Sequence, residues 1–262
     1  MKNNLSNIKK AINYLNKDKC VGIPTETVYG LAANAYSSVA TAKIYKLKRR
    51  PKKNPLIVHY YDLKFLKNDC ELNDLFLKLY KKYSPGPISY ILKLKKGSSI
   101  SKFVTNNKNT LAVRFPRHPI ARRLLKNLNY PLAAPSANIS TKISPVSRED
   151  VKDEFGKKLS LILDGGQSKI GVESTVVELV NKPQILRLGG ISKNHIKNFL
   201  NLNIIYNKNS KKIKSPGQSK THYSPYIKLR LNIKKSVKNE AFILIKKRKQ
   251  KNKDFFYLTK KN

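Results

Sequence analysis

The chain has 262 residues, of which 40% are hydrophobic, and its 55 lysines and arginines exceed its 15 acidic residues by a formal net charge of +40. This length allows a full buried core, so we expect one large domain with a small appendage. No run approaches the roughly 18 apolar residues of a membrane span, the lysine-rich start lacks a secretory signal, and Cys20 and Cys70 are too few for a disulfide framework. We therefore expect a cytoplasmic protein without membrane contact, and the scattered histidines and cysteines predict no metal site.

The net charge raises the question of nucleic-acid binding, since lysine and arginine neutralise phosphates. Most of the basic residues are lysines, however, and they run along the whole chain together with many asparagines. A protein dedicated to reading nucleic acid more often clusters arginine with aromatic residues. A solvated lysine surface is therefore the simpler interpretation, and a basic RNA-binding module is the alternative.

The apolar patterns predict helices and strands in alternation. The first element is an amphipathic helix that Ser6 can cap and that ends near Lys17. Further helices are expected over residues 38–49, 71–83, 118–128 and 147–155. Strands are expected over residues 20–23, 55–60, 88–94, 110–115, 132–134, 160–163, 174–180 and 184–188. Strands separated by helices favour an α/β layered sheet, and several short gaps favour hairpins, so the sheet should be mixed.

The composition changes after Tyr206, where the chain becomes polar and lysine-rich before Ser215-Pro216-Gly217. Such a stretch is typical of a connector. Apolar runs at 226–233, 241–245 and 255–258 could pair as strands, but so short a segment can hardly hold a core alone. We therefore expect three parts, namely a main domain over 6–206, a linker over 207–226 and a short C-terminal remnant over 227–262.

Polar residues follow the first predicted strand. Pro24-Thr25-Glu26-Thr27 comes directly after the apolar run 20–23, where an α/β enzyme usually holds its substrate. The cationic cluster Lys48-Arg49-Arg50 follows at the end of the predicted helix 38–49. Cations there also stabilise the helix dipole, yet a guanidinium fork suits phosphate and Lys48 adds a point charge beside it.

Other strand ends carry polar groups too. Arg114 lies in an otherwise apolar strand, so we interpret it as an anion clamp for a substrate carboxylate, with a structural ion pair as the alternative. Ser136 and Asn138 follow a short strand among small residues, where turn chemistry is the other explanation. Glu173-Ser174-Thr175-Val176 opens a strand and Arg187 closes another, so both could face the same cleft.

Several familiar site patterns do not occur in the sequence. Residues 164–171 resemble a phosphate loop, but valine follows Gly171 where such a loop needs lysine and then serine or threonine. No Ser-His-carboxylate order, no paired carboxylates and no GxGxxG stand out. The cations, hydroxyls and small residues suit the binding and alignment of polyanions more than covalent or proton-shuttle catalysis.

These features fall into an ordered series of motifs. The motifs are Pro24-Thr25-Glu26-Thr27-Val28-Tyr29-Gly30-Leu31, Lys48-x-Arg50-Pro51, Asn54-Pro55-Leu56, Ser84-Pro85-Gly86-Pro87, Ala112-Val113-Arg114, Pro135-Ser136-Ala137-Asn138 and Glu173-Ser174-Thr175-Val176. In combination they resemble the YrdC-like, L-threonylcarbamoyladenylate synthase family over about residues 6–205. Thr221-His222-Tyr223-Ser224-Pro225 resembles the linker of the longer, two-domain members, although the segment after it is shorter than their second domain.

The resemblance implies a nucleotidyltransferase that makes threonylcarbamoyl-AMP and pyrophosphate from L-threonine, bicarbonate and ATP, with Mg²⁺. The product would pass to a downstream threonylcarbamoyl-transferase complex, which modifies adenosine 37 of tRNAs that read codons starting with A. The resemblance also implies a YrdC-like α/β fold, with a twisted mixed sheet flanked by helices and an open, basic concave face that could contact RNA.

The resemblance also assigns residues to roles. The threonine-binding residues would be Thr27, His59, Arg114, Ala134 and Ser174. The ATP-binding residues would be Arg50, Asn54, Thr110, Ser136, Ser144, Arg187 and Tyr223. Lys48 and Arg50 form the Lys-x-Arg pair that is expected to take part in catalysis, and no residue is implied as a metal ligand.

Overall fold

The computed structural model describes residues 2–207, 230–233, 237, 240–244 and 255–257. The chain divides into two compact units, Met1–Ser224 and Pro225–Asn262. In the described part of the second unit, β10 (Phe242–Leu244) and β11 (Phe255–Tyr257) pair in parallel. The expected pairing of these two apolar runs is thereby confirmed. All the candidate site residues described below belong to the first unit.

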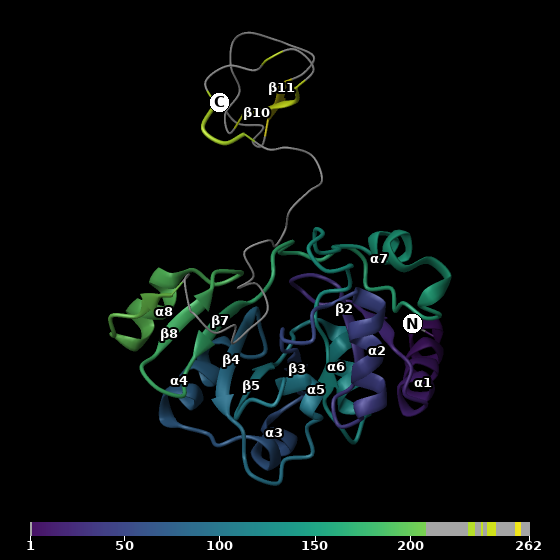
Figure 1. The fold of residues 1–262 in the computed structure, drawn as a ribbon, viewed down its shortest axis with the longest axis horizontal. Helices are drawn as coiled ribbons and strands as arrows, with labels where there is room; N and C mark the ends of the chain where they lie inside the picture. Colours follow the sequence, from purple (N-terminus) through teal and green to yellow (C-terminus); the bar gives the residue numbers. More distant parts are fainter. Residues whose placement is uncertain (1, 208–229, 234–236, 238–239, 245–254, 258–262) are drawn as a thin grey trace. The chain divides into compact units, whose positions relative to one another are not determined.

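A nine-stranded sheet forms the centre of the first unit. Its strands are β1 (Val21–Ile23), β2 (Gly30–Asn34), β3 (Ile57–His59), β4 (Ile88–Lys93), β5 (Thr110–Arg114), β6 (Leu132–Ala133), β7 (Thr175–Glu178), β8 (Gln184–Arg187) and β9 (Ile205–Tyr206). Their order across the sheet is β1-β2-β6-β3-β5-β4-β7-β8-β9 (Figure 1). The pairs β3/β5, β4/β7 and β8/β9 are parallel and the others antiparallel. The predicted mixed α/β sheet is confirmed.

Every α-helix after the first begins at a polar side chain that caps its free N–H groups. The Ser37 hydroxyl accepts from Ala40 N at the start of the second helix, and Ser147 and Asp150 form a capping box at the start of the seventh. The helices are α1 (Lys2–Asn16), α2 (Ser38–Lys48), α3 (Leu63–Asp69), α4 (Asp74–Tyr83), α5 (Lys102–Thr105), α6 (Pro119–Lys126), α7 (Arg148–Phe155) with the 3₁₀ turn Gly156–Lys158, and α8 (Lys193–Leu200) (Figure 1).

Side chains of the central strands alternate between two environments. One set belongs to the main hydrophobic core and includes Val58, Tyr90, Val113 and Val177. The next residues along the strands form a smaller apolar cluster, which we call the apolar strip: Ile57, Ile91, Ala112, Val176 and Leu186. Successive side chains of a strand point to opposite faces, so His59, Ser89 and Arg114 share the face of the apolar strip. This face carries the candidate site.

Helices α1 and α6 cover one end of the sheet. Leu15 of α1 and Leu124 of α6 pack in a second core cluster with Val21 and Ile23 of β1 and Ala32 of β2. This cluster is fully buried at Leu15 and Leu124, which is consistent with the apolar periodicity that predicted both helices. The cluster therefore holds β1 in place, and with it the turn that follows β1.

The expected strand over 160–163 is wrong. Only Ile162 pairs there, in an isolated parallel bridge with Gly22. Leu163 N donates to Gly22 O at 2.8 Å, and the chain then leaves the strand direction at Asp164. Gly22 N also donates to Leu161 O at 2.9 Å, so the segment makes one short contact with β1, and Leu163 is its buried apolar residue.

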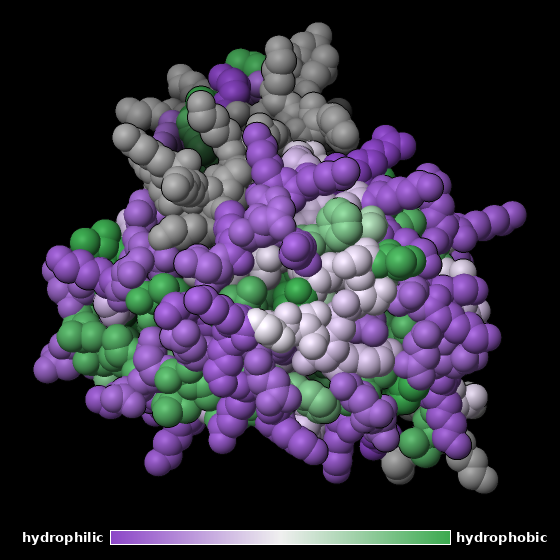
Figure 2. Space-filling view, turned by 60° about the horizontal axis from the view of Figure 1, so that its bottom comes forward, coloured by the Kyte–Doolittle hydropathy of each residue, from purple (hydrophilic) through white to green (hydrophobic). Residues whose placement is uncertain are grey.

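Several elements were not predicted from the sequence. They are β2, α3, α5, α8 and β9. Of the apolar run 226–233, residues 230–233 contain no strand, and residues 226–229 lie outside the described residues. Within the described part of the chain, no helix combines the length and the hydropathy that a bilayer crossing requires. Hydrophilic residues cover most of the face shown in Figure 2, with hydrophobic patches between them.

Candidate active site

A pocket of about 450 Å³, counting space open to solvent, lies on the face of the apolar strip. It forms where β3, β5 and β8 end and β7 begins, beside the turns that follow β1 and β6. Most of the site residues expected from the sequence line it, although they come from segments far apart in the chain. The expected residues in its lining are Thr27, Arg50, His59, Arg114, Ala134, Ser136, Ser174 and Arg187.

Five expected residues are not in this lining. Tyr223 lies outside the described residues, so the prediction for it stays untested. The other four are Lys48, Asn54, Thr110 and Ser144, and each is placed below by its own contacts.

The turn after β1 is fixed by its own hydroxyl groups. The Thr25 hydroxyl accepts from Thr27 N at 3.2 Å and from Val28 N at 3.3 Å, and it donates to Val28 O at 2.6 Å. A threonine at the first position of a turn can thus satisfy backbone groups that no strand pairs. Thr27, fully buried in the same turn, lines the pocket, and its hydroxyl lies 2.9 Å from the Thr25 hydroxyl.

Residues 164–171, which we call the strap, lie across this turn. The backbone N–H groups of Ile170 and Gly171 donate to the carbonyls of Glu26 and Thr27, both at 3.0 Å. Both bonds are made by main-chain groups. The segment that resembles a phosphate loop in the sequence therefore supports the turn, and none of its residues lines the pocket.

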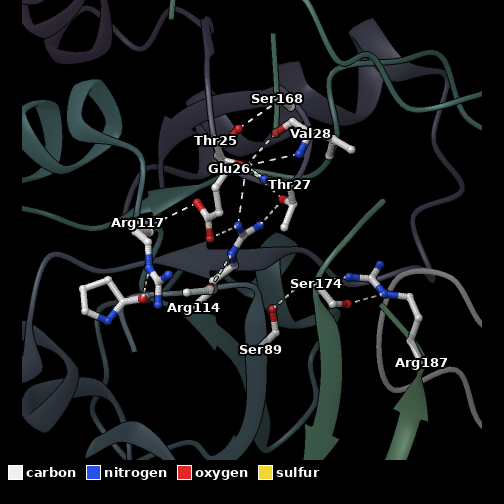
Figure 3. Close-up of polar contacts among 12 residues, drawn as sticks. Thr25, Glu26, Thr27, Val28, Ser89, Arg114, Arg117, Ser168, Ser174 and Arg187 are labelled. Carbon is white, nitrogen blue, oxygen red and sulfur yellow. Dashed lines mark hydrogen bonds and ion pairs between the residues drawn. The ribbon is translucent and has the colours of Figure 1, made fainter. Parts of the chain in front are cut away.

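Two side-chain contacts complete the strap. The Ser168 hydroxyl donates to Thr25 O at 3.0 Å (Figure 3). Gly165 lies so close to Pro24 that a Cβ atom there would meet the proline ring at 2.6 Å. Only glycine allows the strap to approach the turn this closely.

Arg114 at the end of β5 is held in one position by several acceptors (Figure 3). Its Nη2 donates to Glu26 Oε1 at 2.7 Å, its Nη1 to Thr27 Oγ1 at 2.8 Å, and its Nε to Gly86 O at 3.4 Å. The other carboxylate oxygen, Glu26 Oε2, accepts from Arg117 N at 2.9 Å. Arg114 is thus in a buried ion pair, the alternative that the sequence left open, and it also lines the pocket; its role as an anion clamp stays a prediction.

The Glu26 carboxylate is ionised in this arrangement. Burial alone would raise its pKa, but the charge of Arg114 and the hydrogen bonds from Arg114 and Arg117 outweigh burial and lower the pKa. Breaking such a buried pair leaves an uncompensated charge, so each partner depends on the other.

His59 faces Arg114 across the parallel pair β3/β5. It is 2% exposed and lines the pocket, and among the described residues its Nδ1 atom has no hydrogen-bond partner. Burial first, and the charge of Arg114 second, lower the pKa of the imidazole well below its usual value. His59 therefore presents a neutral ring with an unpaired nitrogen, the kind of buried group that a ligand satisfies.

A second ion pair lies at the start of β7. Arg187 contacts the Glu173 carboxylate, and its Nε donates to Ser174 O and its Nη2 to Ser174 Oγ, both at 3.0 Å. Ser144 Oγ donates to the other oxygen of Glu173 at 2.9 Å, and Ser89 Oγ lies 2.8 Å from Ser174 Oγ (Figure 3 shows the serine pair and Arg187). Ser144 therefore reaches the site through Glu173.

Arg50 contrasts with the other two pocket arginines. Its Nε donates to Asn54 O at 3.0 Å and its Nη2 to Pro55 O at 2.9 Å, and no carboxylate contact is described for it. Burial lowers the pKa of its guanidinium to about 10, so it remains charged at neutral pH. The buried Asn54 Oδ1 has no hydrogen-bond partner among the described residues. The guanidinium of Arg50 also interacts with the Tyr45 hydroxyl and, at longer range, with the charge of Glu173, but no carboxylate contacts it directly among the described residues.

Lys48 lies behind the pocket rather than in its lining. It is 1% exposed, and its Nζ donates to Ser136 O at 2.6 Å and to Asn138 O. Burial first, and the nearby charge of Arg50 second, lower its pKa to about 7. The structure gives Lys48 contacts with the loop that carries Ser136, and its expected part in catalysis stays a prediction.

Thr110 begins β5, at the opposite end from Arg114. Asn54 precedes β3 at the corresponding end of the same parallel pair. The two ends of β5 are about 13 Å apart at the usual rise of a strand. The residues between them on this face belong to the apolar strip. Thr110 and Asn54 therefore lie beyond the apolar strip from the Arg114 end of the site.

The carboxylates Glu26 and Glu173 were not assigned a role from the sequence. Each stands inside a polar motif, but the arginine that it pairs with comes 88 residues later for Glu26 and 14 residues later for Glu173. Within the described residues, no group of histidine, cysteine, aspartate or glutamate side chains could hold a metal ion. The acidic residues of the site therefore neutralise arginines.

Comparisons with known proteins agree on one family. The Sua5/YciO/YrdC family model, described as telomere recombination, matches residues 13–189, and the model of the threonylcarbamoyl-AMP synthase C-terminal domain matches residues 191–262. The threonylcarbamoyl-AMP synthase of Pyrococcus abyssi is 39% identical over 83% of this chain and 65% of its own length. The putative threonylcarbamoyl-AMP synthase of Methanocaldococcus jannaschii is 35% identical over 65% of this chain and 81% of its own length.

Solved structures give the same result. The crystal structure of P. abyssi Sua5 complexed with L-threonine is similar with a TM-score of 0.79 and 38% identity, over 83% of this chain and 65% of that one. E. coli YciO has a TM-score of 0.63 and 25% identity over 71% of this chain and 90% of its own. The chain thus spans slightly less than two thirds of the curated P. abyssi relative and most of the shorter ones. From its fold, its motifs and these similarities, the chain belongs to the Sua5/YciO/YrdC family.

Proposed function

We propose that the chain is an L-threonylcarbamoyladenylate synthase, which forms threonylcarbamoyl-AMP and pyrophosphate from L-threonine, bicarbonate and ATP. The observation that carries the proposal is the convergence of Arg50, Arg114 and Arg187 on one pocket, together with neutral hydroxyls and an unpaired imidazole. Relatives named threonylcarbamoyl-AMP synthase and the threonine complex of P. abyssi Sua5 support it.

Threonine occupies the end of the pocket that Thr27, His59 and Arg114 form, with Ala134 and Ser174 beside them. Nη1 of Arg114 faces the pocket next to the Thr27 hydroxyl and donates to the threonine carboxylate. The unpaired Nδ1 of His59 accepts a hydrogen bond from the bound amino acid. We call this the amino-acid end.

ATP occupies the other end, which Arg50, Ser136 and Arg187 form. The cations bind the phosphates, and the apolar strip offers a surface for the nucleoside in the direction of Asn54 and Thr110. Ser144 acts on this end by donating a hydrogen bond to Glu173, and Lys48 holds the backbone of the Ser136 loop. Tyr223 is proposed as an ATP contact on the resemblance alone. We call this the nucleotide end.

The reaction proceeds by alignment of the two substrates. The threonine amine forms a carbamate with bicarbonate and releases water, and a carbamate oxygen then attacks the α-phosphorus of ATP, which releases pyrophosphate. Arg50 and Arg187 lie where negative charge develops on the phosphates, and fixed cations of this kind stabilise a transition state without reorganisation.

Mg²⁺ would enter with ATP rather than bind a protein site of its own. Among the described residues, Glu173 is the acidic side chain in the pocket lining, and it already contacts Arg187. Phosphate oxygens, which Mg²⁺ commonly uses as ligands, would then hold the ion, and the ion would offset charge on the phosphates. No residue of the pocket is assigned as a metal ligand.

Residues 6–206 form the catalytic part in this proposal, 207–226 a linker and 227–262 a short C-terminal part. The protein acts in the cytoplasm and passes its unstable product to a threonylcarbamoyl-transferase complex for modification of tRNA adenosine 37. Its basic residues could add direct contact with RNA. The alternative function is that of a non-catalytic RNA-binding module, and the net charge of +40 is the feature that favours it.

The proposal is tested by pyrophosphate release from ATP in the presence of bicarbonate and L-threonine. Release should require threonine, and Arg114→Ala should abolish it, whereas Arg123→Ala on the exposed side of α6 should leave it unchanged. Threonine-independent release contradicts the proposal. So does the absence of release when the protein binds RNA tightly and in a salt-dependent way, which is the outcome expected of an RNA-binding module.

A further inference from the structure

The two ends of the pocket differ in how their arginines are compensated. At the amino-acid end, the carboxylate of Glu26 lies 2.7 Å from Arg114, and the neighbouring His59 is neutral. At the nucleotide end, Glu173 contacts Arg187, and its single negative charge is the acidic charge described beside the two arginines. Arg50 donates to two backbone carbonyls and interacts with the Tyr45 hydroxyl, and Lys48 lies close to it. The charges of the described groups therefore sum to zero at the amino-acid end and to a positive value at the nucleotide end.

Glu26 itself is not in the pocket lining. One of its oxygens contacts Arg114 Nη2 and the other accepts from Arg117 N, so the carboxylate lies between the Arg114 guanidinium and Arg117 (Figure 3). Arg114 lines the pocket, and its Nη1 donates to the hydroxyl of Thr27, another residue of the lining. Any effect of Glu26 on a bound ligand must pass through Arg114 or through its own charge.

We propose that Glu26 is a specificity-determining residue, which neutralises Arg114 so that the amino-acid end takes a zwitterionic amino acid and rejects phosphate groups. This inference rests on the proposed function and adds to it the reason why ATP phosphates stay at the nucleotide end. Without such a device, a site with three arginines and a lysine around one pocket would offer phosphate two competing positions.

The size of the effect follows from Coulomb's law. An anion on the pocket side of Arg114 would lie about 6 Å from the Glu26 carboxylate, and at an effective dielectric constant of about 20 their repulsion changes an affinity by about a hundredfold. Salt and relaxation reduce this to about tenfold. A zwitterion carries no net charge, so its affinity depends much less on the charge of Glu26. Phosphate affinity should therefore respond more strongly than threonine affinity.

The experiment measures the displacement of bound labelled L-threonine by inorganic phosphate, without ATP and at constant ionic strength. Phosphate should leave threonine bound to the wild-type chain. Phosphate should displace threonine from Glu26→Gln at concentrations at least about tenfold below the lowest concentration that affects the wild type. Glu71→Gln is the matched control, because it removes one acidic charge from an exposed pair with Lys93.

Glu26→Asp separates charge from contact geometry. Its shorter side chain keeps the negative charge but cannot make the same contacts, so phosphate should remain unable to displace threonine from it. Displacement from the aspartate variant, or equal displacement from wild type and Glu26→Gln, overturns the inference. The aspartate variant gives this answer even when Glu26→Gln fails to fold, and thermal unfolding of each variant identifies that failure.

Threonine binding by the wild-type chain distinguishes a failure of the proposed function from a failure of the inference about Glu26. A wild-type chain that binds no threonine overturns the proposed function and the inference with it. If the wild-type chain binds threonine and phosphate displaces that threonine as readily as from Glu26→Gln, the inference alone is overturned.

Discussion

The amino-acid end and the nucleotide end lie on the same face of one sheet, yet they hold their cations in different ways. Arg114 has a carboxylate, a hydroxyl and a carbonyl around it, so its position and charge are set before any ligand binds. Arg50 donates to two carbonyls and interacts with the Tyr45 hydroxyl, without a direct carboxylate contact among the described residues, and the buried Lys48 beside it has a lowered pKa. The turn after β1 thus supplies the carboxylate that neutralises Arg114 at the end of β5. Arg50, which follows α2, has no such carboxylate in direct contact within the part of the chain that the structure describes.

The largest expected effect comes from Arg114→Ala. Truncation leaves Glu26 buried without its partner and removes the donor to the threonine carboxylate. Threonine affinity should fall by about 3 kcal/mol or more, roughly a hundredfold, while ATP affinity changes much less. Isothermal titration with each ligand measures both effects. Equal losses for threonine and ATP would show that the two ends are not separate.

Arg50→Ala tests the opposite end. A charge-assisted hydrogen bond contributes about 1–3 kcal/mol, so ATP affinity should fall by that amount and threonine affinity should stay near the wild-type value. Arg49→Ala is a matched control, because Arg49 is exposed at the end of α2 and does not line the pocket. A larger loss for threonine than for ATP would reverse the assignment of the two ends.

The charge state of Lys48 makes a prediction about pH. Its pKa is about 7 in the folded chain, whereas an unfolded lysine has a pKa of about 10.4. Between these values the unfolded chain binds a proton that the folded chain does not, so the free energy of unfolding should rise with pH, by about 1 kcal/mol per pH unit. The cost of burying the charged form is complete below pH 7 and disappears as the pH rises towards 10.

Lys48→Met removes this dependence. Urea unfolding of both proteins at pH 7, 8 and 9 should show the wild type gaining stability relative to the variant at each step. Parallel behaviour of the two proteins would mean that Lys48 keeps its proton in the folded chain, as a fully charged member of the nucleotide end.

The smallest effect is expected outside both ends. Ser147→Ala removes the side chain of the capping box at the start of α7 and should lower the free energy of unfolding by about 1 kcal/mol. Neither ligand affinity should change, since Ser147 does not line the pocket. Chemical denaturation measures the loss, and a change in either affinity would show that α7 is coupled to the site.

The sequence predicted the sheet and most of its long helices because their apolar periodicity is strong. β2 was missed because its Gly-Leu-Ala-Ala-Asn is small and apolar on both faces, without the alternation of a half-buried strand. The expected strand at 160–163 was wrong because its pairing with β1 is limited to a single bridge between Ile162 and Gly22, which a local apolar pattern does not reveal. α8 has one fully buried hydrophobic residue, Ile196, so its pattern is weak.

The sequence predicted the cationic residues of the site, but not the carboxylates with which they form ion pairs. An arginine in an otherwise apolar strand, as at Arg114, can be recognised from the sequence as an unusual buried charge. Its pairing with Glu26 cannot, because it forms only where the turn after β1 meets the end of β5. No local pattern contains that contact. The same holds for Lys48, whose place behind the Ser136 loop follows from the packing of α2 and not from the Lys-x-Arg spacing.

The main-chain bonds of the strap have a consequence for which mutations this site tolerates. Because Ile170 and Gly171 use peptide groups to hold the turn, substitution of the exposed Ile170 side chain should leave its geometry intact. The three glycines are different, since a side chain at Gly165 would collide with Pro24, and Gly166 and Gly171 have φ of +70° and +76°. Variation in a library of mutants should therefore be broad at the exposed non-glycine positions of the strap and restricted at its glycines and at Ser168, whose hydroxyl donates to Thr25 O.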